Sequence, residues 1–127
     1  MKYFFDNAIS PKYAHMLAAL EVDAVALRDE FPPDIDDVAL FERLRGRDIV
    51  FVTADRRIRR RQSEARALRE CGVTALFFGP FWSKMGFWQQ AAWFVAKWPL
   101  LDGFARGAAR GTCAEVKQNG KSVVFAS

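Results

Sequence analysis

Short apolar runs alternate with segments of helical character along most of the chain, and this alternation limits the fold more than any other feature. The runs at residues 2–5, 23–27, 48–53 and 73–78 have the length and composition of buried strands. Stretches with helix signals separate them. Strands that alternate with helices in this way predict an α/β fold, with a mostly parallel central sheet and helices on both faces.

Helix boundaries between these runs follow from capping residues. Ser10 and Pro11 are a typical helix start, with Ser as the N-cap and Pro in the first turn. Asp34 is expected to cap the next helix, with Asp37 three residues on as a carboxylate variant of the capping box. A third helix is expected over residues 60–71. The two consecutive prolines before Asp34 predict that residues 28–33 form a loop.

The last third of the chain predicts further helices and a hairpin. Two helical segments are expected, at residues 83–97 and 100–110, on either side of Pro99. Residues 112–116 and 121–125 flank an Asn-Gly pair, which is a strong signal for a β-hairpin. We expect this hairpin to add antiparallel strands at one edge of the sheet. With no repeat or linker in the sequence, residues 1–127 are expected to form a single domain.

Composition narrows the class of protein. About half of the residues are hydrophobic (51%), which is enough for a core without disulfides or structural metals. The two cysteines are not in a CxxC pair, so no zinc or disulfide pattern is present and a reducing, cytoplasmic location is expected. No signal peptide and no membrane span are expected, because a span needs about 20 mostly apolar residues.

Positive charge is concentrated in one place. The net charge is +4, and five arginines fall within six positions: Arg56, Arg57, Arg59, Arg60 and Arg61. Such a cluster favours polyanions, nucleic acid first. The alternative is a solvated helix start with no binding role.

Acidic residues follow the strands at the edge where α/β proteins bind ligands. Asp6 ends the first run, Asp55 lies just past the third, and Asp36 and Asp37 open the helix after the second. Ligands bind beyond the carboxyl ends of parallel strands, so these acids are expected to converge. Crowded carboxylates repel one another, and a hard divalent cation such as Mg²⁺ removes that conflict and can activate water on a phosphodiester.

Each acid also has a purely structural explanation. Asp6 could be a turn residue after a strand, and Asp55 could cap a turn before the arginines. Asp36 and Asp37 could be helix N-terminal acids that the macrodipole favours. If all of these explanations held, four acids with unrelated structural roles would lie at the same edge of the sheet by coincidence.

Three segments resemble the PIN-like domain family. Residues 1–20 (MKYFFDNAISPKYAHMLAAL) resemble its opening strand, acid and helix, and residues 27–40 (LRDEFPPDIDDVAL) resemble its loop and acidic helix start. Residues 50–73 (VFVTADRRIRRRQSEARALRECGV) resemble its third strand, T-x-D motif and Arg-rich stretch. The match is nearest to the compact branch grouped with VapC-type toxins of toxin–antitoxin pairs.

The resemblance implies a Mg²⁺- or Mn²⁺-dependent ribonuclease. By position, Asp6, Asp37 and Asp55 match the family acids, with Asn7 and Thr53 as supporting residues. Many members carry a further Asp shortly after the third acid, where this chain has arginines. Glu64 and Asp36 are the candidate substitutes.

The resemblance also implies partners. RNA would be the substrate, with its backbone held by Arg57, Arg59, Arg60 and Arg61. An antitoxin protein is the expected partner, and a homodimer is a second possibility. All four tryptophans fall within residues 82–98, mostly as expected core residues, with one or two left to form an interface. His15, the single histidine, is expected to be a surface or packing residue.

Two other functions remain open at this point. One is a non-catalytic RNA- or protein-binding module that kept the fold and lost the metal. The other is a receiver-type phosphoacceptor domain, which would need an acidic pair at the end of the first strand and a lysine after a fifth parallel strand. Here the first strand ends in Asp6-Asn7 and the chain is expected to close in a hairpin.

Overall fold

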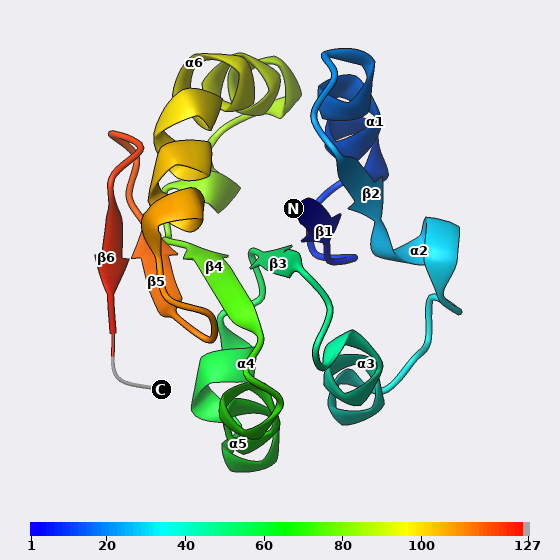
Figure 1. Cartoon of the computed structure of the whole chain (residues 1–127). Helices are drawn as coiled ribbons and strands as arrows, with labels where there is room; N and C mark the ends of the chain where they lie inside the picture. The colour runs from blue at the N-terminus through cyan, green and yellow to red at the C-terminus, as the bar shows by residue number, and fades with distance from the viewer. Residues whose placement is uncertain (126–127) are drawn as a thin grey trace.

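A computed structural model describes residues 1–125 and shows one six-stranded sheet in the order β2-β1-β3-β4-β5-β6 (Figure 1). The strands are β1 (Lys2–Phe5), β2 (Ala24–Ala26), β3 (Ile49–Thr53), β4 (Thr74–Phe78), β5 (Cys113–Val116) and β6 (Ser122–Val124). The helices are α1 (Pro11–Ala19), α2 (Leu27–Glu30), α3 (Asp37–Leu44), α4 (Arg57–Arg60), α5 (Gln62–Cys71) and α6 (Phe87–Gly107), with a 3-10 turn, η1 (Trp82–Lys84).

The first five strands run parallel, which confirms the predicted α/β class. β1 pairs with β2 on one side and with β3 on the other, so the chain changes direction across the sheet at β1. The expected pairing of the hairpin was wrong in one respect. β5 pairs parallel with β4, and only β6 is antiparallel. The long α6 connection carries the chain back to the starting edge, so β5 enters in the same direction as β4.

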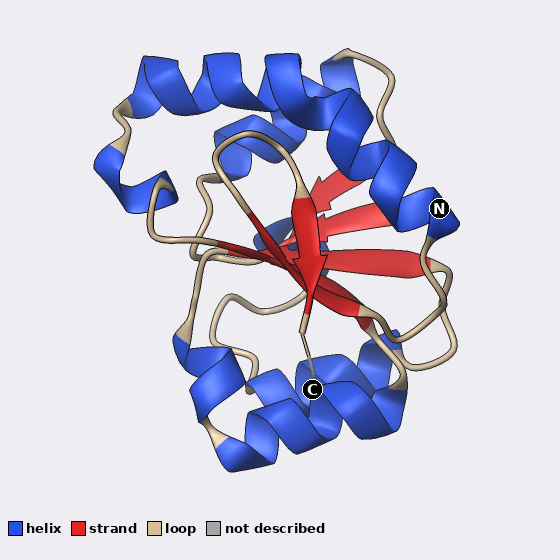
Figure 2. Ribbon diagram, turned by 90° about the vertical axis from the view of Figure 1, so that its left-hand side faces the viewer, coloured by secondary structure: helices blue, strands red, loops and turns tan. Residues whose placement is uncertain are grey.

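Each face of the sheet buries its own core, because successive side chains of a strand point to opposite faces. On one face, α1 and α6 cover a cluster that includes Phe5, Tyr13 and Phe94. On the other, α3 and α5 cover a cluster that includes Phe4 and Phe41. Figures 1 and 2 show the sheet between these two helical layers.

The expected break at Pro99 does not occur, and α6 is one helix of 21 residues. Proline removes one helical hydrogen bond and its ring crowds the preceding turn. Pro99 lies on the exposed side of α6, so the carbonyl group it frees can reach water, while Trp98 and Leu101, before and after it, are buried against the core. No helix within residues 1–125 is long and apolar enough to cross a membrane.

Three local boundaries also differ from expectation. Residues 27–30 form one helical turn, α2, inside part of the expected loop, and the prolines that follow it end the turn. Asp36, not Asp34, caps α3: its side chain accepts a 3.3 Å hydrogen bond from the backbone N–H of Ala39. The expected helix over residues 60–71 is divided at Arg61, whose extended backbone separates α4 from α5.

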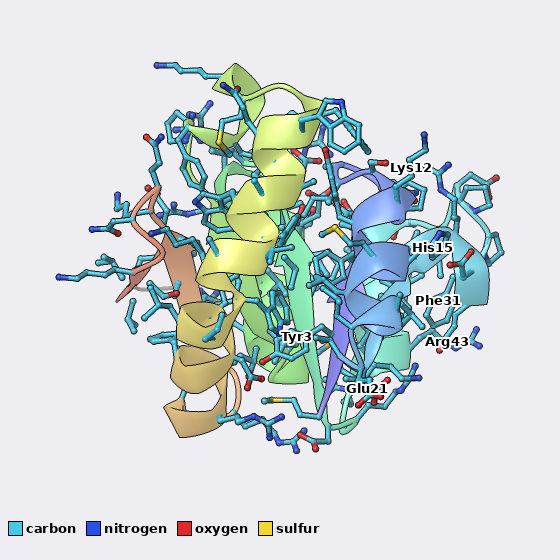
Figure 3. The ribbon with its side chains drawn as sticks, turned by 90° about the horizontal axis from the view of Figure 1, so that it is seen from above. Tyr3, Lys12, His15, Glu21, Phe31 and Arg43 are labelled. Atoms are coloured by element: carbon cyan, nitrogen blue, oxygen red, sulfur yellow. The ribbon has the colours of Figure 1, made fainter. Side chains whose placement is uncertain are left out.

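Most of the tryptophans are core residues, as expected. Trp82, Trp93 and Trp98 are buried against the α1–α6 face, whereas Trp88 is 82% exposed at the start of α6. His15 lies on α1 (Figure 3) and is exposed. It contacts Asp29 of α2 at 2.7 Å. Its surface position agrees with the sequence-based expectation.

Candidate active site

The carboxyl ends of β1 and β3 bring Asp6 and Asp55 together. Phe5 pairs with Val52, and the backbone N–H of Asp6 donates to the Val52 carbonyl at 2.9 Å. Thr53, the last residue of β3, donates from its hydroxyl to Asp6 Oδ2 at 2.8 Å. The same hydroxyl accepts a 2.9 Å hydrogen bond from the backbone N–H of Asp55. Thr53 therefore links both acids at the point where the strand order reverses, the usual place for a ligand in an open α/β sheet.

Burial dominates the electrostatics of Asp6. The residue is 9% exposed, and burial raises the pKa of its carboxyl above the ordinary value. Hydrogen bonds from Thr53 and from the backbone N–H groups of Asn7 and Ala8 act in the opposite direction, and the negative charge of Asp55 adds to the increase. The hydrogen bonds therefore fix the position of the Asp6 carboxyl group, while burial disfavours its ionised form.

Asp37 lies at the electrostatic centre of the acids. It is the first residue of α3, and its pKa is raised to about 6. Burial is the largest cause, followed in order by the negative charges of Asp6, Glu64, Asp55 and Asp36. Residues from four separate segments of the chain therefore act on one carboxyl group.

Glu64 and Asp36, the two candidates for a fourth acid, occupy very different positions. Glu64 is the third residue of α5 and is 9% exposed. Its Oε1 accepts from Arg61 at 3.1 Å, while Oε2 is buried without a hydrogen-bond partner. Asp36 is exposed, and its side chain is used as the cap of α3. A buried carboxylate oxygen without a partner is costly, so Glu64 is the acid that an added cation would stabilise most.

Asp55 differs from the other acids because an arginine already neutralises it. Burial alone would raise its pKa, but the hydrogen bonds from the side chain and backbone of Arg57 and the charges of Arg57 and Arg61 outweigh burial. The pKa of Asp55 is consequently below its ordinary value. Arg57 contacts Oδ1 through Nε at 3.0 Å and Oδ2 through Nη2 at 3.2 Å.

The other arginines of the cluster differ in whether their side chains contact the rest of the protein. Arg59 bonds Glu115 of β5 at 2.9 Å and lies over the Phe125 ring, 3.6 Å from its centroid. Arg60 is exposed, and within residues 1–125 its side chain makes no hydrogen bond or ion pair. Arg56, Arg59, Arg60 and Glu115 line a hollow of about 420 Å³. The Glu115 contact had no local signal in the sequence, because β5 is 56 residues away from Arg59.

Asn7 supports the site through the backbone. Its side-chain amide donates to the Pro33 carbonyl at 2.8 Å, which ties the loop before α3 to the end of β1. That loop leads directly into Asp36 and Asp37. This contact ties the loop that bears Asp37 to the end of β1, while the supporting role of Asn7 in catalysis stays a prediction.

The chemistry of the donor set suits a hard divalent cation, although the acids are not gathered around one point. Within residues 1–125, no three His, Cys, Asp or Glu side chains form a group that could hold a metal ion. The donors are nonetheless all carboxylates, two have raised pKa values, and Glu64 Oε2 lacks a partner. Mg²⁺ and Mn²⁺ prefer oxygen ligands, and Mg²⁺ commonly uses only one or two carboxylates with water and phosphate.

A family profile described as PIN like domain matches residues 1–80. This chain belongs to the PIN-like domain family. The matched part of the PIN-like domain runs from β1 through β4 and contains Asp6, Asp37, Asp55 and Glu64. Domains of this family commonly have nuclease activity. Searches of curated proteins and of solved structures found no match to this PIN-like domain.

The receiver-type interpretation needs one correction. β5 is a fifth parallel strand and Lys117 follows it directly, so the expectation that a hairpin replaces this strand was wrong. Lys117 is nevertheless paired with Glu115 at 2.6 Å, and only one acid ends β1. Both observations agree with the PIN-like assignment.

Proposed function

We propose that this PIN-like domain is a Mg²⁺- or Mn²⁺-dependent endoribonuclease that hydrolyses RNA phosphodiester bonds. The observation that carries the proposal is the convergence of acids at one edge of the sheet: Thr53 links Asp6 and Asp55 at the ends of β1 and β3, and burial together with the charges of these two acids and Glu64 raises the pKa of Asp37. Such mutual repulsion destabilises a metal-free protein and is difficult to explain as a structural device.

Asp6, Asp37, Asp55 and Glu64 are the residues that would hold the ion. When bound, a divalent ion activates water and stabilises the negative charge that develops on the phosphodiester. The remaining steps belong to the protein itself. Thr53 fixes the orientation of the Asp6 carboxylate, and Asn7 holds the loop that carries Asp37.

We propose that the arginine cluster contacts RNA and that its members contribute in different ways. Arg60 is free to bind a phosphate. Arg59 is already held by Glu115 and Phe125, so it would present a fixed positive charge rather than a mobile contact. Phosphate contacts of this kind position the RNA without reading its sequence.

The test compares metal-dependent cleavage by wild type and two matched variants. Wild-type protein should cleave a single-stranded RNA with Mn²⁺ or Mg²⁺ and not with chelator. Asp6→Asn should remove most of this activity. Asp34→Asn is the control, because Asp34 lies in an exposed turn outside the carboxylate cluster. Wild-type levels of metal-dependent cleavage by Asp6→Asn would contradict the proposed role of Asp6.

A non-catalytic RNA-binding module is the second candidate, favoured by two observations. Arg57 already neutralises Asp55, and the described acids are not grouped for a metal. RNA binding without cleavage under any of the metal conditions would support this candidate.

We further propose the toxin role, with an antitoxin as partner. It is based on the resemblance to VapC-type toxins. The exposed apolar side chains of α6, including Trp88, Val95 and Leu100, are the proposed antitoxin surface, with a homodimer as the alternative occupant. Expression in a bacterial host should arrest growth, and Asp6→Asn should not. Normal growth during wild-type expression would count against the toxin role.

A further inference from the structure

Two acids of the cluster are already paired with arginines from the same chain. Arg57 bonds Asp55, and Arg61 bonds Glu64 at 3.1 Å. In both pairs the acid is shielded and the arginine is open to solvent: the Asp55 side chain is 15% exposed and that of Arg57 is 70% exposed. The guanidinium groups therefore cover their carboxylates from the solvent side.

Arg57 occupies both oxygen atoms of Asp55. Oδ1 accepts from the backbone N–H and from Nε of Arg57, each at 3.0 Å, and Oδ2 accepts from Nη2 at 3.2 Å. A guanidinium fork matched to a carboxylate is among the stronger hydrogen-bonded pairs in proteins. Glu64 differs, since Arg61 uses only Oε1 and leaves the buried Oε2 without a partner.

We propose that Arg57 is a latch that competes with the metal for Asp55: it occupies this carboxylate in the metal-free protein, and the divalent ion must displace it. The inference rests on the metal site of the proposed function. Glu64, whose buried second oxygen has no partner, is the acid of the cluster that a bound ion would stabilise most.

The latch has two opposite effects. In the metal-free protein it stabilises the fold, because it supplies positive charge next to carboxylates that repel one another. During metal binding it opposes the ion, because its hydrogen bonds must break and because its charge repels a cation. Removing Arg57 should therefore tighten metal binding and weaken the metal-free fold.

Arg56 provides a matched control for charge alone. It is adjacent to Arg57 and exposed, and within residues 1–125 its side chain makes no hydrogen bond or ion pair. Arg56→Gln and Arg57→Gln remove the same charge at neighbouring positions. Only Arg57→Gln releases a carboxylate.

The experiment is a calorimetric titration of the metal-free protein with Mn²⁺ at constant pH and ionic strength, without RNA. We expect Arg57→Gln to lower the Kd for Mn²⁺ by about tenfold or more, because charge-assisted hydrogen bonds no longer compete. Arg56→Gln should change the Kd by no more than about twofold, since exposed charges are screened by salt. Thermal melting without metal should show a lower Tm for Arg57→Gln than for Arg56→Gln.

Equal changes in Kd for the two variants would overturn the latch, and so would an unchanged Kd for Arg57→Gln or an absence of Mn²⁺ binding in all three proteins. If Arg57→Gln does not fold, Arg57→Lys keeps the charge without the fork and should give a smaller decrease in Kd; an unchanged Kd for Arg57→Lys would then overturn the latch.

The failure of the proposed function can be told apart from the failure of the latch. If Arg57→Gln binds Mn²⁺ more tightly and wild type does not cleave RNA, the latch is supported and the nuclease function is contradicted. If wild type cleaves RNA and the Kd of Arg57→Gln is unchanged, the nuclease function is supported and the latch is contradicted.

Discussion

The Thr53 hydroxyl donates a 2.8 Å hydrogen bond to the Asp6 carboxylate across the junction of β3 and β1. It also accepts from the backbone N–H of Asp55, so one buried side chain controls the positions of two acids. Because this hydrogen bond acts against the burial that raises the pKa of Asp6, Thr53 affects both the orientation and the charge of the carboxylate.

Thr53→Val should reduce stability by about 1–2 kcal/mol, since one buried and one partly buried hydrogen bond are lost while the shape is nearly kept. The pKa of Asp6 should increase further, and metal-dependent cleavage should decrease. Thr74→Val is the control: Thr74 is buried at the opposite end of the sheet and accepts from the Gly111 N–H at 2.9 Å. Urea unfolding and cleavage assays should show a stability cost for both variants and loss of activity only for Thr53→Val. Equal activity in the two variants would remove Thr53 from the site.

Asp6→Asn should leave the metal-free protein at least as stable as wild type at pH 7.5. Burial and the charge of Asp55 disfavour ionised Asp6 more than the hydrogen bonds from Thr53 and the backbone N–H groups of Asn7 and Ala8 favour it, and the amide oxygen remains as an acceptor for the Thr53 hydroxyl. Thermal melting in chelator is the measurement, with Asp34→Asn as the surface control. A large drop in Tm for Asp6→Asn would indicate that Asp6 is mainly structural.

Stability should depend on pH through Asp37. Its folded pKa of about 6 lies above the ordinary value of 3.8, so between these values the folded state binds more protons than the unfolded state. The contribution of Asp37 to the free energy of unfolding should therefore fall as pH rises from about 4 to about 6, and Asp6 contributes with the same sign. Carboxyls with lowered pKa values, such as Asp55 and Glu115, contribute with the opposite sign, so the difference between wild type and Asp37→Asn isolates Asp37. Asp37→Asn should remove part of this slope and be more stable than wild type by about 1 kcal/mol at pH 7, since solvent screens the partly exposed carboxyl.

The check is urea unfolding of metal-free wild type and Asp37→Asn at several pH values between 4 and 7. Asp36→Asn is the neighbouring control, because Asn serves as well as Asp at the N-cap. Parallel stability curves for wild type and Asp37→Asn would show that Asp37 is not the titrating group.

Arg59 and Arg60 should behave differently despite being adjacent. Arg59→Ala removes an ion pair and a cation–π contact and should lower stability by about 1 kcal/mol. Arg60→Ala should leave stability unchanged and weaken RNA binding, with the salt-dependence slope reduced by about 0.7, the value for one contact to a single strand. Filter binding over a salt series measures the slope, and an unchanged slope for Arg60→Ala would show that this side chain is only solvated.

The sequence by itself determined the elements whose signals are local. Four apolar runs became β1 to β4, and Ser10 caps α1 as expected, because strand burial and helix capping depend on residues a few positions apart. The same alternation predicted that Asp6 and Asp55 would lie at the carboxyl edge of the sheet. Parallel strands bring such residues together whatever the details of packing.

Only the tertiary structure decided the features that depend on distant contacts. Pro99 signals a break, yet Trp98 and Leu101 bury enough surface to carry α6 through it. The parallel direction of β5 follows from where α6 returns the chain, and no pattern within residues 112–116 encodes that. The electrostatic properties of the site are decided in the same way. Glu64 and Asp37 are 27 positions apart in the sequence, and their effect on each other depends on burial and distance, which exist only after α3 and α5 pack on the same face of the sheet.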